Sequence, residues 1–158
     1  MTTNIKRRVF LKGSVAAGTV GVAVGAGLLA PQAVLAAWDE KAFKAESVDD
    51  ALAAAMGDAS HAASDEIKIK APDIAENGAV VPVSVSTDMS DVESIALLAE
   101  GNNTPLVATF MLGEGAVADV STRIKMGKTS DVIAVVKSGG KLLSARKSVK
   151  VTIGGCGG

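Results

Sequence analysis

After residue 66, several stretches alternate apolar with polar residues and others are short apolar runs, and both patterns predict short β-strands. Residues 67–70 and 81–86 show the alternation clearly, since every second residue there is apolar. Further strands are expected at residues 93–100, 106–112, 120–126, 132–136 and 141–153. Seven short strands with turn residues about every 8–12 positions are typical of an antiparallel sandwich. The predicted fold class is therefore all-β, an immunoglobulin-like β-sandwich with one N-terminal helix.

The stretch 39–56 has a helical period instead. Its apolar residues fall on one face of a helix: Ala42, Phe43, Val48, Ala51, Leu52, Ala55 and Met56. This pattern predicts one helix over 39–56. Ser47 with Asp50 three residues later is an N-cap signal, which would begin the helix near Ser47. Gly57 is expected to end it.

Two features inside the strand region predict local geometry. Gly139-Gly140 separates two apolar runs and predicts a two-residue hairpin turn of the primed type. Pro82 has no N–H to give to a sheet, so its strand is expected at an edge, or Pro82 is expected to face outward at a bulge.

The first 36 residues are expected to be an export signal that is removed from the mature protein. Arg7-Arg8 followed by apolar residues resembles the twin-arginine motif. The apolar stretch 15–29 is broken by glycines and is shorter than the roughly 20 residues of a spanning helix, so a membrane anchor is the less favoured alternative. Val34-Leu35-Ala36 is a small-residue cleavage pattern. The sequence therefore predicts a mature protein that begins near Ala37, has no membrane segment and lies in the periplasm.

The composition excludes several kinds of site. Only 3% of residues are aromatic, so stacking platforms for nucleic acid are not expected. The chain has one His and one Cys, too few for a zinc site or a haem attachment motif, and no metal site is predicted. A dyad of His61 and Cys156 is conceivable, but His61 lies in the polar stretch 57–61, which favours a solvated loop histidine.

The charge is unevenly distributed along the chain. The whole sequence has 16 basic and 17 acidic residues, and removing Lys6, Arg7, Arg8 and Lys12 with the signal leaves 12 basic residues and a net charge of −5. From residue 120 onward there are eight basic residues and a single acid, Asp131. The basic third of the chain therefore adjoins Cys156.

The last five residues, Gly154-Gly155-Cys156-Gly157-Gly158, are the most unusual feature. Glycine has no Cβ and adopts nearly all backbone conformations, so residues 154–158 are predicted to be a thin, flexible arm that follows the helix-plus-sandwich domain 37–153. The arm would carry the sulfur up to about 10 Å beyond the last strand. A flexible arm cannot hold a base and an oxyanion hole in place, so no catalytic residue is predicted in this chain, and the reactions are expected in partner enzymes.

Two functions remain open from these residues. One is a carrier whose thiol is loaded and unloaded by partner enzymes. The other is an exported adhesive or assembly sandwich that forms a homodimer through Cys156. A prenylation site is excluded, because that signal needs three residues after the Cys.

Several parts of the sequence together resemble the SoxY family, the sulfur carriers of periplasmic thiosulfate oxidation. They are the twin-arginine signal, the helix before a β-sandwich, the stretches 71–82 and 121–127, and the ending Val151-Thr152-Ile153-Gly154-Gly155-Cys156-Gly157-Gly158. The resemblance covers the whole chain. It implies that Cys156 holds the sulfur and that Gly154, Gly155, Gly157 and Gly158 form a swinging arm.

The same resemblance implies partners and intermediates. It implies a heterodimer with a SoxZ-like sandwich, a c-type haem enzyme that joins thiosulfate to the cysteine, a dimanganese hydrolase that removes sulfate and, in some members, a sulfane dehydrogenase. It implies no bound cofactor in this chain, only S-thiosulfonate and persulfide adducts on Cys156. Arg146, Lys147 and Lys150 are candidates for shielding these anions, with a solvated strand face as the alternative. Apolar runs at 95–99 and 132–136 are expected to leave surface that a partner covers.

Overall fold

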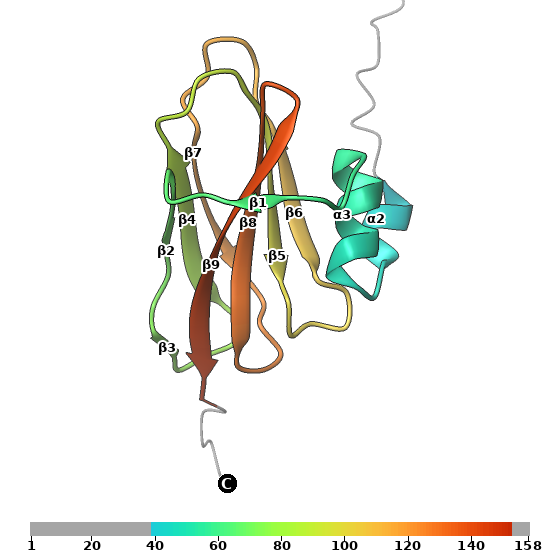
Figure 1. The fold of residues 1–158 in the computed structure, drawn as a ribbon. Helices are drawn as coiled ribbons and strands as arrows, with labels where there is room; N and C mark the ends of the chain where they lie inside the picture. The colour runs from blue at the N-terminus through green and yellow to red at the C-terminus, as the bar shows by residue number, and fades with distance from the viewer. Residues whose placement is uncertain (1–38, 153–158) are drawn as a thin grey trace, which may run out of the picture. The chain divides into compact units, whose positions relative to one another are not determined.

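The computed structural model describes residues 39–152, which fold into two β-sheets with a pair of helices beside them (Figure 1). The predicted signal peptide and arm lie outside the described residues. The helices are α2 (Glu40–Lys44) and α3 (Val48–Met56). The strands are β1 (Ala62–Ala63), β2 (Ile67–Lys70), β3 (Ile74–Ala75), β4 (Val81–Thr87), β5 (Val92–Ala99), β6 (Leu106–Met111), β7 (Asp119–Ile124), β8 (Ser130–Ser138) and β9 (Lys141–Val151).

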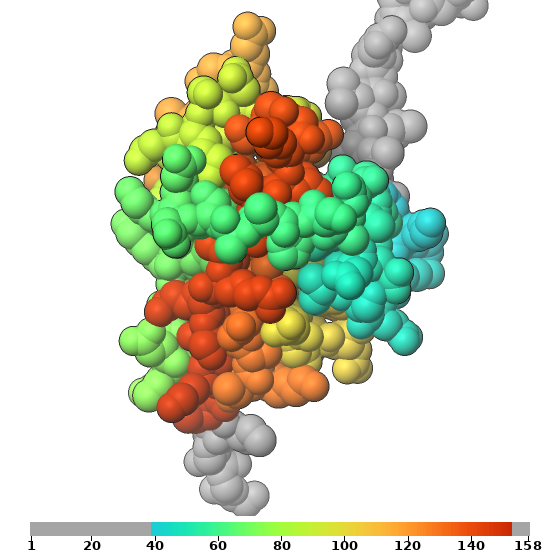
Figure 2. Space-filling view, viewed as in Figure 1, coloured from blue at the N-terminus to red at the C-terminus, as the bar shows by residue number. Residues whose placement is uncertain are grey.

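The larger sheet has the order β1-β9-β8-β5-β6, and the smaller has the order β2-β4-β7. All pairings among the seven longer strands are antiparallel, which confirms the predicted sandwich. The two-residue strands β1 and β3 were not predicted. Both run parallel to β9 and pair with it near its beginning and its end, respectively. In Figure 2 the segment that contains β1 runs in front of part of β9, with which it pairs at the edge of the sheet.

One apolar core lies between the two sheets. Alternate residues of β4 and β8 point into it, among them Val81, Val83, Val85, Val132 and Ala134, and all of these are 2% exposed or less. The outward face of β4 is polar, and its Ser84 hydroxyl lies 2.8 Å from the hydroxyl of Ser121 on β7. This alternation explains why a period of two in the sequence predicted these strands.

A second apolar core covers the other face of the larger sheet. Leu52 of α3 packs there with Leu98, Ile133 and Val135, and each of these four residues is fully buried. Strands β5 and β8 are therefore apolar on both faces because the sheet is covered on one side by the smaller sheet and on the other by helices. The expectation that the runs 95–99 and 132–136 leave surface for a partner is wrong, since this chain buries them itself.

The helical region differs from the single helix predicted over 39–56. Ala45 has an extended backbone with ψ of 137°, and it separates α2 from α3. Ser47 caps α3 by accepting a hydrogen bond from the Asp50 N–H at 3.1 Å, which confirms the predicted N-cap. Gly57 ends α3 in the left-handed conformation with φ of 87°, as predicted.

The turns agree with the sequence. Gly139 and Gly140 have φ of 53° and 75°, the positive values that a type I′ hairpin turn requires. Pro82 lies on β4, the middle strand of its sheet, and the register there shows no bulge, so the expected edge strand or bulge is wrong. On one side of β4, however, β2 ends at Lys70, which pairs with Ser84. Pro82 is therefore exposed at a place where β4 has no neighbour on that side, which is how a central strand accommodates it.

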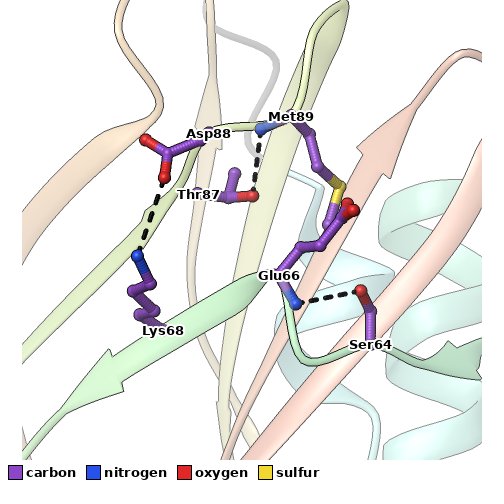
Figure 3. A network of polar contacts seen from close by, with 6 residues as sticks. All are labelled: Ser64, Glu66, Lys68, Thr87, Asp88 and Met89. Carbon is purple, nitrogen blue, oxygen red and sulfur yellow. Dashed lines mark hydrogen bonds and ion pairs between the residues drawn. The ribbon is translucent and has the colours of Figure 1, made fainter.

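Polar contacts hold the end of the sandwich where β2 begins and β4 ends (Figure 3). The ammonium of Lys68 lies 3.6 Å from the Asp88 carboxylate, and the Met89 N–H donates to the Thr87 hydroxyl at 3.3 Å. The Glu66 N–H donates to the Ser64 hydroxyl at 3.3 Å. The Lys68 and Asp88 side chains are exposed, so their ion pair adds little stability.

Candidate functional site

The predicted sulfur-bearing residue Cys156 and the arm glycines Gly154, Gly155, Gly157 and Gly158 lie outside the described residues. The structure describes the point from which the arm would extend. Strand β9 ends at Val151, and Thr152 is the last described residue. We call Val151 and Thr152 the arm base.

Hydrogen bonds hold the arm base from both sides. On one side Thr152 donates its N–H to the carbonyl of Ala75, the last residue of β3, at 3.0 Å. On the other side the Val151 N–H donates to the hydroxyl of Thr129 at 2.9 Å, and that hydroxyl donates to the Val151 carbonyl at 3.4 Å. The chain is therefore hydrogen-bonded on both sides as far as Thr152.

Gly78 shows how closely the chain packs around the arm base. A Cβ at Gly78 would lie 2.4 Å from the Met126 carbonyl oxygen and 2.7 Å from Cγ1 of Val151. The Gly78 carbonyl accepts a hydrogen bond from the Met126 N–H at 2.7 Å. Only glycine fits at this position without displacing Met126 or the last strand.

Two of the three predicted anion-shielding residues are already paired with carboxylates. The Arg146 guanidinium lies 3.2 Å from the carboxylate of Glu100, and the Lys147 ammonium lies 2.6 Å from the carboxylate of Asp73. The hydrogen bond from Lys147 and its positive charge hold the pKa of Asp73 below its usual value. Lys150 is exposed, and it has no ion pair within residues 39–152. Of the three, only Lys150 presents an uncompensated charge.

A polar hollow of about 370 Å³ lies at the same end of the sandwich. It is lined by residues 101–104 of the β5–β6 loop and by Lys125, Gly127 and Lys128 of the β7–β8 loop. Lys128 immediately precedes Thr129, the residue that bonds to the arm base. We call this feature the lysine hollow.

His61 lies far from the arm base. It directly precedes β1, whose Ala62 pairs with Leu143 near the beginning of β9. At about 3.3 Å per residue, Leu143 and Val151 are about 26 Å apart, whereas four residues after Thr152 reach only about 13 Å. The conceivable dyad with Cys156 is therefore excluded. His61 does lie in a loop, as expected, but it is half-buried, and its Nδ1 is buried without a hydrogen-bond partner in the described part of the chain.

Two kinds of feature are absent from the described residues. Residues 39–152 contain no group of three or more His, Cys, Asp or Glu side chains placed to hold a metal ion. Within the same range, no helix has the length and apolar character needed to cross a membrane.

Sequence reasoning missed the contacts that build this end of the molecule. Glu100 and Asp73, which neutralise Arg146 and Lys147, lie 46 and 74 positions away from them in the chain. The pairing of Thr129 with the arm base also joins distant segments. The likeness of stretches 71–82 and 121–127 to a known family was the one available signal, and it indicated the segments without indicating their contacts.

Comparisons with known proteins agree with this architecture. The family model for sulfur oxidation protein SoxY matches residues 52–156, a range that includes Cys156. The solved structure of the sulfur carrier protein SoxY from Chlorobium limicola f thiosulfatophilum is 45% identical, with a TM-score of 0.62, and the alignment covers 72% of this chain and 99% of that one. The comparison with curated proteins gives no match.

A second solved structure is more distantly similar. The superoxide reductase (neelaredoxin) from Ignicoccus hospitalis is 24% identical with a TM-score of 0.48, and the alignment covers 54% of this chain and 80% of that one. This likeness carries no argument about function.

The two-sheet sandwich and the family match together define a protein of the sulfur-carrier class. The chain belongs to the SoxY family of sulfur oxidation proteins. This confirms both the predicted family and the predicted all-β fold class.

Proposed function

We propose that this protein carries thiosulfate-derived sulfur covalently on Cys156 and presents it to partner enzymes. The observation that carries the proposal is the SoxY family match, which extends through Cys156, the only cysteine of the chain. The fixed arm base supports it, because a rigid anchor followed by Gly154 and Gly155 confines the movement to the arm.

The proposed cycle has two balanced steps. In the first, the Cys156 thiol and thiosulfate lose one proton and two electrons to an electron-accepting haem enzyme, and a new S–S bond gives Cys–S–S–SO₃⁻. In the second, water attacks the sulfonate sulfur, and the bond between that sulfur and the neighbouring sulfane sulfur breaks. Sulfate and two protons are released, and a persulfide, Cys–S–S⁻, remains on the chain. A hydrolase of the dimanganese type would catalyse this step. The chain itself supplies the attachment point and binds no cofactor in this proposal.

The proposed location is the periplasm, reached by the twin-arginine pathway. The support is the Arg7-Arg8 motif and the short apolar stretch that follows it, which belong to residues outside the described range. An oxidising compartment also suits a protein whose intermediates contain S–S bonds.

Intact mass spectrometry tests the carrier function. The protein purified from cells oxidising thiosulfate is expected to carry mass increments equal to S₂O₃ and to single sulfur atoms, located on Cys156 by peptide mapping. A disulfide-linked dimer without such increments would support the assembly function instead. Unmodified thiol throughout would contradict both functions.

We further propose a heterodimer with a SoxZ-like sandwich subunit. The support is the family resemblance alone, because β5 and β8 are covered within this chain. Co-expression of the two subunits is expected to give a stable one-to-one complex by light scattering, at a mass equal to the sum of the two. Separate elution of the two proteins at micromolar concentration would contradict this.

A further inference from the structure

The lysine hollow concentrates positive charge that no carboxylate within residues 39–152 neutralises. Lys125 and Lys128 are both exposed, and neither takes part in an ion pair in this range. No Asp or Glu lines the hollow, and its remaining polar side chains are those of Asn102, Asn103 and Thr104. The lysine hollow differs in this respect from Arg146 and Lys147, which already form ion pairs with carboxylates.

One side chain, that of Asn102, links the two loops that form the hollow. Asn102 of the β5–β6 loop donates its amide N–H to the Lys125 carbonyl at 2.8 Å and accepts a hydrogen bond from the Gly127 N–H at 2.8 Å. Its amide thus joins the two loops that form the walls. Gly101 completes the wall, since a Cβ there would lie 3.0 Å from Cγ of Lys128, so the lysine stem rests against the glycine backbone. Such fixed walls lower the entropy that binding would cost.

The hollow is also within reach of the arm. Lys128 is adjacent in sequence to Thr129, whose hydroxyl bonds to Val151 at 2.9 Å. An extended chain spans about 3.3 Å per residue, so the four residues that follow Thr152 and end at Cys156 span up to about 13 Å. A group on Cys156 can therefore reach the hollow while the sandwich stays unchanged.

We infer that the lysine hollow binds the terminal sulfonate of the Cys–S–S–SO₃⁻ adduct, an inference that rests on the proposed carrier function. A sulfonate presents three anionic oxygens, and ammonium groups bind oxoanions by charge-assisted hydrogen bonds. The persulfide left after sulfate release has no such oxygens. The arm is therefore retained at the hollow while it bears a sulfonate and is released when it bears only a persulfide.

The attraction between the two lysines and the sulfonate is expected to be modest. Both lysines are exposed, so their interaction with an anion is weakened by water and by salt. The tether compensates, because a short flexible linker gives an effective concentration in the millimolar range. Free thiosulfate has the same chemistry without the tether, and it is expected to fill the hollow only at concentrations far above that of the protein.

The test uses backbone amide NMR shifts of the full protein in three forms: free thiol, tetrathionate-treated, and loaded then desulfonated to the persulfide. Tetrathionate loads Cys156 directly, since the thiolate breaks its central S–S bond and expels thiosulfate. We expect residues 101–104 and 125–128 to shift in the loaded form and to return in the persulfide form. The shifts should fall at least about threefold in 0.5 M salt, where the Debye length is about 4 Å.

The variant Lys125→Gln/Lys128→Gln should lose most of these shifts, by about threefold or more, and still load fully by mass. The matched control is Lys41→Gln/Lys141→Gln, which removes the same charge from two exposed lysines without ion pairs in the described chain. It should keep the shifts.

Each other outcome has a separate meaning. Full loading without shifts in the two loops overturns the inference and leaves the carrier function intact. Failure of Cys156 to load contradicts the carrier function itself. Equal shifts from equimolar free thiosulfate in a Cys156→Ser protein would show a site for free anions and overturn the retention of the arm.

Discussion

The Cys156→Ser protein is expected to fold normally and to accept no thiosulfate-derived sulfur at all. Cys156 is the only thiol of the chain, and a serine hydroxyl cannot form the S–S bond on which both proposed steps depend. The residue comes after the last residue of β9 in the sequence, and serine differs from cysteine by a single atom, so the unfolding temperature should remain within about 1 °C of the wild type. Thiosulfate oxidation in a reconstituted system measures the first effect, and thermal unfolding measures the second.

A matched variant separates the thiol from its place on the arm. Ser148 is exposed on β9, three positions before Val151, so Cys156→Ser/Ser148→Cys keeps one accessible thiol close to the arm base. This thiol should react with a small alkylating reagent but should not restore turnover, because the strand cannot enter a partner's site. Restored turnover would show that any nearby thiol suffices and that the arm has no role in delivery.

Replacing Gly155 and Gly157 with Val is expected to reduce sulfur loading by an order of magnitude or more. β-Branched side chains restrict the backbone and widen the arm, whereas delivery into an enclosed site needs a thin and mobile chain. A tenfold loss corresponds to roughly 1.4 kcal/mol of activation free energy. The measurement compares two rates on one protein: alkylation by a small reagent, which should stay near the wild-type rate, and loading by the haem enzyme.

Two controls accompany the arm variant. Gly113→Val makes the same change in a loop where a Cβ meets no atom within 4 Å, and it should affect neither rate. The double Ala variant of Gly155 and Gly157 should fall between wild type and Val. An equal loss of alkylation and loading would show that the valines bury the thiol, and unchanged loading would refute the requirement for a thin arm.

The sequence itself determined the features that depend on neighbours along the chain. Ser47 caps α3, Gly57 ends it, and Gly139-Gly140 turns between β8 and β9, because each relies on hydrogen bonds or backbone angles within a few residues. Strands β2, β4 and β7 followed from alternation, since one face of each packs in the core between the sheets, whereas β5, β6 and β8 followed from short apolar runs. The predicted identity of the sulfur-bearing residue also depended on the sequence alone, and it stays a prediction because Cys156 lies outside the described residues.

Only the tertiary structure decided what surrounds the arm base. Strands β1 and β3 have two residues each, too few to show a period, and they exist because β9 offers them a free edge. The burial of both faces of β5 and β8 depends on α3, which precedes them by about 40 residues or more in the chain. Sequence periodicity shows that a face is apolar but not which segment covers it. The prediction that a partner covers the runs 95–99 and 132–136 was therefore wrong.

The same limit applies to charge. The sequence showed a basic third of the chain beside Cys156, but it could not show that Glu100 and Asp73 return to neutralise Arg146 and Lys147. Nor could it show that Asn102 joins two loops so that Lys125 and Lys128 face one hollow. Local interactions are encoded within a few residues, whereas ion pairs and hollows form where the fold brings distant segments together. The sequence therefore determined which residue is proposed to carry the sulfur, and the tertiary structure decided which charges are free to receive it.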